Sequence, residues 1–222
     1  MKISKFGNME YLINLPSDYE EGKRYPVVLF LHGAGTLGDD ISLVAQNPFM
    51  KALLGQDEFS FITVAPHSKW ETWFDRLETL KGLVKHIALE GYTDPLRLYL
   101  IGCSMGGYGA WQLAMSMPQY FAALIPICGG GMYWNAGKLV NVPVWAFHGE
   151  NDSTVLVEES IKMVDAVNKK GGNARLTVYP DTKHDAWTPT YSNKEVFRWL
   201  FSQRNQNTVA LTEEYSGDSA FG

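Results

Sequence analysis

The stretch LRLYLIGCSMGGYGA, residues 96–110, joins an apolar run to a segment of small residues through a glycine-flanked serine. The apolar run is typical of a strand, and residues 105–117 are expected to form a helix that stops before Pro118. The turn GCSMG, residues 102–106, matches the pattern G-x-S-x-G, in which glycines permit a sharp bend that lifts the serine above the strand end. The context of strand, turn and helix makes Ser104 a candidate nucleophile.

Other apolar runs flank this stretch and alternate with segments of helical periodicity. The expected strands are residues 25–32, 59–66, 96–103, 121–128, 142–148 and 174–179, with an edge strand at 11–15. The expected helices are residues 75–90, 105–117, 155–169 and 193–201. Continuous apolar strands that alternate with helices predict an α/β fold with a mostly parallel central sheet and helices on both faces. We expect one domain over residues 1–202 and a polar extension over residues 203–222.

A serine hydroxyl needs an adjacent base to act as a nucleophile, and the chain has five histidines. His184 lies in the loop DTKHDAW after the last expected strand, on the same side of the sheet as Ser104. This position also fits the chain order serine, acid, histidine, so we predict that His184 is the base. His67, which follows the second expected strand, is the alternative.

The acid that orients this base should follow the strand at residues 142–148. The turn HGENDSTV, residues 148–155, offers Asp152, whose carboxylate would accept a hydrogen bond from the histidine and fix its tautomer. Glu150, Asp181 and Asp185 are rivals. Asp152 could also serve only as the N-cap of a helix that begins near Val155.

A tetrahedral intermediate requires hydrogen-bond donors for its oxygen. One should be the backbone N–H of Met105, next to the nucleophile, and the second should come from the loop LHGAGTLG, residues 31–38. Within this loop Ala34 is the first choice and Gly35 the second. A phosphate-binding loop is excluded because no Gly-Lys-Ser/Thr follows the glycines.

Aromatic residues are concentrated in the loops expected near the site. Trp70 and Trp73 lie in residues 67–74, and Trp187 comes three positions after His184. We predict that these three residues line a substrate pocket, with the alternative that their indoles only cover the edge of the core.

Composition excludes several classes of function. The net charge is -5 with a pI near 5.5 and no basic stripe, which argues against nucleic acid as a partner. No apolar run could span a membrane and no signal peptide is visible, so a cytoplasmic location is expected, with a trimmed secreted form as the alternative. The two cysteines, Cys103 and Cys128, are expected to be buried, and the sequence implies neither a metal nor a cofactor.

The motifs LHGAG, GCSMGG, HGENDSTV and the His184 loop together resemble the α/β-hydrolase superfamily over residues 25–200. Within it the chain is similar to compact esterases of the phospholipase/carboxylesterase, dienelactone hydrolase and feruloyl-esterase-like types. The resemblance implies a serine esterase that transfers small or medium acyl groups from a small-molecule ester to serine and then to water. Only residues 129–141 separate the expected strands at 121–128 and 142–148, which leaves no room for a large lid domain between them.

Three other functions remain open. A serine peptidase of the prolyl-oligopeptidase kind shares the fold and the order of catalytic residues, although that family normally carries a β-propeller for which this chain is too short. A thioesterase is a second alternative. A catalytically silent protein that binds a ligand is the third, and the sequence leaves open whether the chain is a monomer or a homodimer.

Overall fold

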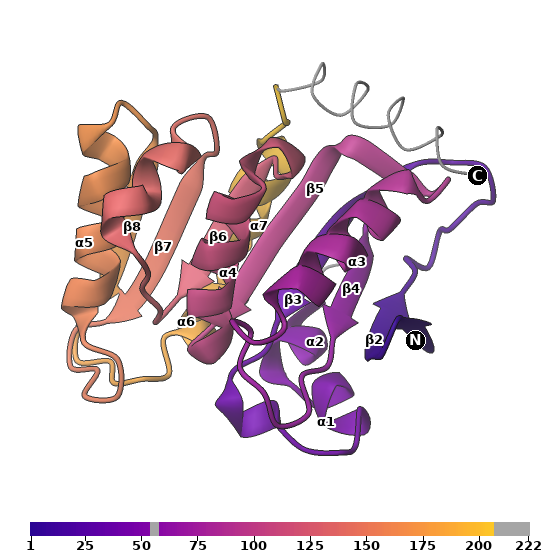
Figure 1. Ribbon diagram of the computed structural model, residues 1–222, viewed down its shortest axis with the longest axis horizontal. Coiled ribbons are helices and arrows are strands. Elements are labelled where there is room, and N and C mark those ends of the chain that lie inside the picture. The colour runs from indigo at the N-terminus through magenta and orange to yellow at the C-terminus, as the bar shows by residue number, and fades with distance from the viewer. Residues whose placement is uncertain (54–57, 207–222) are drawn as a thin grey trace.

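The computed structural model describes residues 1–53 and 58–206, which form one sheet with helices on both sides (Figure 1). The strands are β1 (Lys2–Phe6), β2 (Met9–Asn14), β3 (Tyr25–Leu31), β4 (Ile62–Pro66), β5 (Thr93–Cys103), β6 (Ala123–Ile127), β7 (Val144–Gly149) and β8 (Ala174–Tyr179). The α-helices are α1 (Ser42–Ala45), α2 (Pro48–Leu53), α3 (Leu77–Leu89), α4 (Met105–Ser116), α5 (Val157–Lys169), α6 (Trp187–Ser192) and α7 (Lys194–Ser202). Three short 3₁₀ turns are η1 (Ala34–Thr36), η2 (Pro118–Tyr120) and η3 (Tyr133–Leu139).

The strands follow the order β1-β2-β4-β3-β5-β6-β7-β8 in one eight-stranded sheet. From β4 to β8 all neighbours are parallel, whereas β2 runs antiparallel to both β1 and β4. The carboxyl ends of the parallel strands therefore meet along one edge, where the arrowheads of the central strands lie in Figure 1. This arrangement confirms the predicted mostly parallel sheet.

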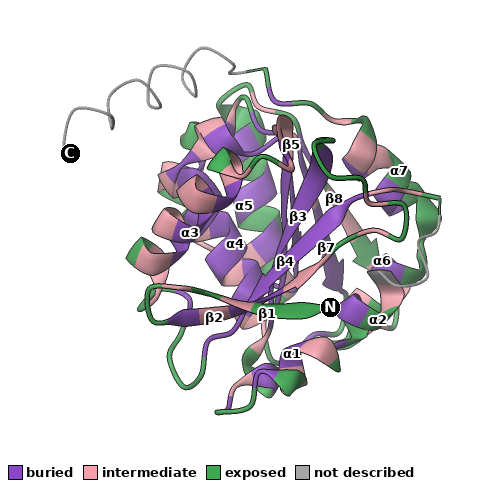
Figure 2. Ribbon diagram, turned by 90° about the vertical axis from the view of Figure 1, so that its right-hand side faces the viewer, coloured by how far each residue is buried: buried purple, intermediate pink, exposed green. Residues whose placement is uncertain are grey.

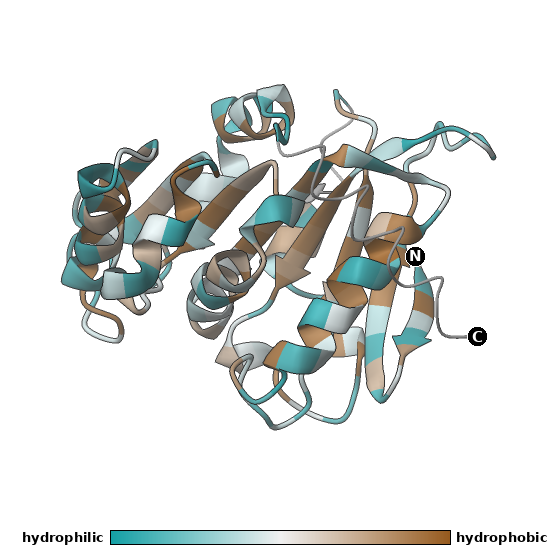
Figure 3. Cartoon of the chain, turned by 45° about the horizontal axis from the view of Figure 1, so that its top comes forward, coloured by the Kyte–Doolittle hydropathy of each residue, from teal (hydrophilic) through white to brown (hydrophobic). Residues whose placement is uncertain are grey.

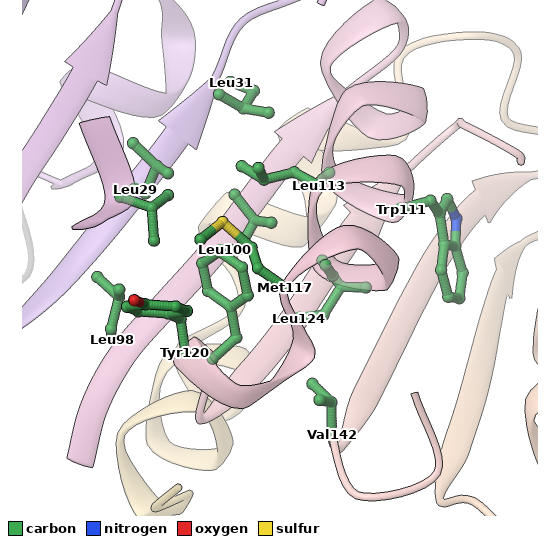
Figure 4. Packing of buried hydrophobic residues seen from close by; sticks show 14 of the residues in the cluster. Leu29, Leu31, Leu98, Leu100, Trp111, Leu113, Met117, Tyr120, Leu124 and Val142 are labelled. Atoms are coloured by element: carbon green, nitrogen blue, oxygen red, sulfur yellow. The ribbon is translucent and has the colours of Figure 1, made fainter. Parts of the chain in front are cut away.

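The sheet separates two hydrophobic cores. Along β3, Val27 and Leu29 point into the core beneath α3, α4 and α5, whereas Val28 and Phe30 point into the core beneath α1, α2, α6 and α7. Figure 2 shows the sheet edge-on as a buried layer between the two helix layers, and Figure 4 shows the packing of the first core. Because neighbouring strand residues face opposite cores, a strand buried on both faces is apolar throughout, as the brown strands of Figure 3 illustrate.

The N-terminal hairpin differs from the prediction. The expected edge strand at residues 11–15 is β2, but β1 forms the edge of the sheet and pairs with it across a two-residue turn at Gly7 and Asn8. Gly7 has a φ of 56°, a left-handed conformation that glycine adopts at low cost. The short helices α1, α2 and α6 were likewise not expected from the sequence.

The end of the predicted domain matches the end of α7 at Ser202, but the first residues of the predicted extension pack against the sheet. The Gln203 carbonyl accepts a hydrogen bond from the Tyr99 hydroxyl at 2.9 Å, and the backbone N–H of Asn205 donates to Leu96. Residues 207–222 lie outside the described part of the chain.

Between β6 and β7 the chain forms only a loop and η3, so the described structure carries no large lid there. The segment between β3 and β4 contains η1, α1 and α2. None of the described helices has the length and apolar character needed to cross a bilayer.

Candidate active site

Ser104 occupies the turn between β5 and α4 in a strained backbone conformation. Its φ of 54° and ψ of -119° are unusual for a residue with a side chain, and such strain costs of order 1–3 kcal/mol. The backbone N–H of Ser104 donates to the Ile127 carbonyl at 2.9 Å, which ties the turn to β6. The first N–H groups of α4 lack partners within the helix and lie next to the serine.

The glycines of this turn are required by close packing. A Cβ atom on Gly102 would lie 2.0 Å from the carbonyl oxygen of Gly106, and one on Gly107 would lie 2.7 Å from that of Ile127. Any larger residue would push α4 away from the strands on which it rests. The glycine pattern thus fixes the height and direction at which Ser104 leaves the sheet.

His184 lies beside Ser104, although 80 residues separate the two along the chain. The His184 Nε2 atom is 2.9 Å from the Ser104 hydroxyl, and Nδ1 is 2.7 Å from Asp152 Oδ2. Because a carboxylate only accepts hydrogen bonds, Nδ1 carries the proton and Nε2 is free to accept one from the serine. The structure therefore brings together the three residues that the sequence selected.

Asp152 is held in a rigid turn. Its side chain is fully buried, and Oδ1 accepts hydrogen bonds from the backbone N–H groups of Thr154 and Val155, both at 2.9 Å. Burial alone raises the pKa of this carboxyl, but the hydrogen bonds from His184, Val155 and Thr154 outweigh it, so the pKa lies below its ordinary value. Helix α5 begins only at Val157, so these bonds close a turn before the helix and Asp152 is not its N-cap.

The rival residues have other partners. Asp185 accepts from the backbone N–H and the hydroxyl of Thr188 at the start of α6, and the exposed Glu150 accepts from the N–H of Asp181. Among the described side chains, no other histidine or carboxylate is recorded with a hydrogen bond to Ser104 or His184.

The other histidines serve the scaffold. His32 is buried, donates to the Gly33 carbonyl from Nδ1 and accepts from the Ser68 N–H at Nε2. Burial lowers the pKa of His32 from its ordinary value of 6.5 to about 4, so the ring is neutral. Burial also lowers the pKa of His67, whose ring lies 5.8 Å from that of His32, and His86 stacks on Phe6 at the far end of α3.

The candidate oxyanion donors lie around the serine turn. Met105 is the first residue of α4, directly after Ser104. A Cβ on Gly33 would lie 3.4 Å from the Cβ of Ser104, so the loop after β3 contacts the serine turn at Gly33. Ala34 is the next residue of this loop. Gly35 is exposed, with nothing within 4 Å of its Cβ position.

The three tryptophans predicted to line the pocket have three different environments. Trp187 opens α6, and its ring lies perpendicular to that of His184 with centroids 5.3 Å apart. Trp70 is 69% exposed and donates to Asp39 at 3.2 Å, which links two surface loops. Trp73 does not belong to an open pocket, because it is 1% exposed and its indole N–H donates to the His32 carbonyl at 2.8 Å.

Cys128 is buried, as predicted, but the sequence did not predict that Cys128 and His148 contact the residues of the site. Burial raises the pKa of the Cys128 thiol, and this thiol donates to the His184 carbonyl at 3.1 Å, which anchors the histidine loop to the end of β6. His148 lies next to Asp152, with its Nε2 atom 3.4 Å from the carboxylate. The first contact joins residues 56 positions apart, and the second depends on how the turn after β7 folds back. Neither can be predicted from a local sequence pattern.

Ligand atoms of Cys128, Asp152 and His184 lie within 4.8 Å of one another, a spacing that could hold a metal ion. The hydrogen bonds of the site already use these atoms, since Asp152 faces His184 Nδ1 and the thiol faces a carbonyl. We therefore assign this cluster to the serine site.

The chain is similar to several known hydrolases. Residues 132–205 match the model of the prolyl oligopeptidase family. A thermostable esterase of known structure is 32% identical, with a TM-score of 0.77 over 88% of this chain and 59% of that one. The curated relatives include dipeptidyl-peptidase 5 of Porphyromonas gingivalis, 23% identical over 90% of this chain and 36% of that protein. They also include the probable feruloyl esterase C of Aspergillus terreus, 23% identical over 77% and 64%.

The chain thus spans about a third of the length of the peptidase and 59% of that of the esterase structure. The similarity nevertheless covers most of this chain, 88% of it for the esterase and 90% for the peptidase. The mostly parallel sheet of this order and the similarity to an esterase of known structure show that the chain has the α/β-hydrolase fold, as the sequence motifs predicted.

Proposed function

We propose that the chain is a carboxylic ester hydrolase for small-molecule esters, with Ser104 as nucleophile, His184 as general base and Asp152 as the acid that orients it. The observation that carries the proposal is the unbroken series of hydrogen bonds from the Ser104 hydroxyl through His184 to Asp152, at 2.9 and 2.7 Å. A serine in a strained turn at a helix start, beside a histidine whose Nε2 faces the hydroxyl, is arranged for proton transfer.

The reaction proceeds in two halves. Ser104 Oγ attacks the ester carbonyl while His184 Nε2 takes its proton, and the resulting imidazolium then protonates the alcohol as the C–O bond breaks. Water, deprotonated by His184, attacks the acyl-serine and releases the carboxylic acid and free Ser104. The developing oxyanion would receive hydrogen bonds from the backbone N–H groups of Met105 and Ala34, and each such donor is usually worth about 3 kcal/mol of barrier lowering.

The similarity to a thermostable esterase and to a feruloyl esterase supports ester hydrolysis. Trp187, whose ring stands against that of His184, offers an aromatic surface to one side of the bound ester. The absence of a lid between β6 and β7 favours a site that accepts small or medium esters directly from solvent.

Peptide hydrolysis is the second candidate function, favoured by the match of residues 132–205 to the prolyl oligopeptidase family. That segment contains Asp152 and His184 but begins after Ser104, so the match covers two of the three proposed catalytic residues. The same acylation chemistry applies to both substrates, and they differ in whether an alcohol or an amine leaves.

A labelling experiment tests the nucleophile. We expect the purified chain to react with a fluorophosphonate, with the added mass on the peptide that contains Ser104, and to release a burst of p-nitrophenol from p-nitrophenyl acetate. Ser104→Ala should abolish both while its circular dichroism stays unchanged. Labelling that persists in this variant would refute the assignment.

A substrate panel then separates the two candidate functions. We expect kcat/KM for aliphatic p-nitrophenyl esters, methyl ferulate or an acetylated sugar to exceed that for dipeptidyl p-nitroanilides by at least about tenfold, a difference of roughly 1.4 kcal/mol in transition-state binding. The opposite ranking would assign the site to a peptidase.

A further inference from the structure

His148 ends β7 directly behind the candidate acid, and the proposed reaction assigns it no part. Its side chain is completely buried, and Nε2 lies 2.8 Å from the carbonyl oxygen of Val155. A carbonyl can only accept, so Nε2 carries a hydrogen atom. The same nitrogen is 3.4 Å from Asp152 Oδ2, while its hydrogen bond goes to the Val155 carbonyl.

The other side of the ring is fixed as well. His148 Nδ1 lies 2.7 Å from the hydroxyl oxygen of Ser160 on α5, and this hydroxyl lies 3.0 Å from the carbonyl of Gly129 after β6. The imidazole is therefore held between the acid turn on one side and α5 with the β6 loop on the other. A ring with both nitrogens engaged and no solvent contact has one orientation available to it.

Oxygen Oδ2 of Asp152 consequently stands between two imidazoles, with His184 Nδ1 at 2.7 Å and His148 Nε2 at 3.4 Å. Oδ1 is already occupied by the N–H groups of Thr154 and Val155. We propose that His148 is a positioning residue for the acid: its Nε2–H holds the carbonyl of Val155, whose own N–H binds Oδ1 of Asp152, so that the carboxylate stays aligned with His184.

This inference rests on the proposed function, because it concerns the alignment of the same histidine and acid. When His184 takes the serine proton, the Asp152 carboxylate must already face the new imidazolium, and a carboxylate free to rotate would lose part of that interaction. His148 has no contact with Ser104 among those recorded for the described residues, so its loss should reduce kcat and leave KM nearly unchanged.

Three variants test the proposal. His148→Phe keeps a ring but removes both nitrogens, His148→Gln can present an amide N–H near the position of Nε2, and Glu150→Gln alters the exposed acid of the same turn as a control. We expect kcat for p-nitrophenyl acetate to fall about 10- to 100-fold in His148→Phe, an effect of the size usually seen when a residue that supports a functional side chain is removed. In His148→Gln most of the wild-type kcat should return. The control should keep the wild-type kcat.

A double-mutant cycle with Asp152→Asn shows whether His148 acts through the acid. In that background His148→Phe should change kcat less than about twofold, because the group that it positions has already been altered. Equal losses in both backgrounds, or a wild-type kcat in His148→Phe, would overturn the proposal. If His148→Phe fails to fold, Ser160→Ala in the same cycle applies the same criterion.

Proton NMR gives a readout that does not depend on activity. The strongly deshielded resonance of His184 Nδ1–H, bonded to Asp152, should be present in the wild type and in His148→Gln and should broaden or vanish in His148→Phe. An inactive wild type with this pattern would refute the proposed function and support the role of His148, whereas an active wild type with an unchanged resonance in His148→Phe would do the reverse.

Discussion

The carbonyl oxygen of Leu31 lies 2.0 Å from the position that a Cβ atom on Gly106 would occupy. Helix α4 thus rests directly on the end of β3, and the serine turn and the glycine-rich loop after β3 are parts of one packed unit. We predict that Gly106→Ala lowers the free energy of unfolding by about 3 kcal/mol, the upper range for overpacking, and abolishes esterase activity. Urea denaturation measures the first effect. The matched change Gly91→Ala should be nearly neutral in both assays, because no atom lies within 4 Å of the position that a Cβ on Gly91 would occupy.

Replacing the acid should leave binding intact while it damages catalysis. Asp152→Asn keeps the size of the side chain, but it cannot enforce the His184 tautomer, and the equivalent change in other triads lowers kcat by roughly 10⁴-fold. We expect such a loss with a KM within about threefold of wild type, because the acid does not touch substrate. Steady-state kinetics on a p-nitrophenyl ester measure both constants. Retention of more than a tenth of kcat would contradict the assignment of Asp152.

Two tryptophans three positions apart should lose very different amounts of stability on truncation. Trp73 is 1% exposed, packs against Gly109 and bonds to the His32 carbonyl, so Trp73→Ala should cost about 3–5 kcal/mol of stability. Trp70 is 69% exposed, and Trp70→Ala should change stability by less than about 1 kcal/mol. Thermal and urea unfolding of the pair test this contrast, and equal losses would contradict the buried placement of Trp73.

Stability should depend on pH through His32. Its pKa falls from 6.5 to about 4 on folding, so the unfolded chain binds a proton more readily than the folded chain between these values. The contribution of the neutral ring is therefore complete above pH 6.5 and is lost as the pH falls toward 4, by about 3 kcal/mol in total. We predict a flatter pH profile of the unfolding free energy in His32→Gln, whose amide oxygen can still accept from Ser68. A slope equal to that of wild type would refute this source of acid sensitivity.

The sequence allowed the sheet and the grouping of Ser104, Asp152 and His184 to be predicted because both depend on local patterns. A strand that is covered on both faces is apolar throughout, and Ser104 and Asp152 follow such strands at the carboxyl edge of the parallel sheet. His184 follows the edge strand β8 at the same side of the sheet. The two-residue turn Gly7-Asn8 is also a sequence signal for the hairpin of β1 and β2. The strand β1 was nevertheless not predicted, because its residues are mostly exposed and lack an apolar run.

Other features depend on contacts that no local pattern contains. Trp70 and Trp73 occur in one loop, and only packing against Gly109 decides which indole turns inward. The thiol of Cys128 meets a carbonyl 56 residues further along the chain, so its role in anchoring the histidine loop required the folded structure. Helix α2, by contrast, begins with Asn47 before Pro48, a cap and first-turn pair that could have been recognised.

The separation of Ser104 and His184 by 80 residues has a consequence for folding. The two side chains meet only after β6, β7 and the outer strand β8 have joined the sheet beside β5, so the site is completed by the last strand on that side. During refolding, reactivity toward a fluorophosphonate would therefore return with the docking of β8 and would lag behind the burial of the central strands. Labelling of Ser104 would in this sense report that assembly is finished.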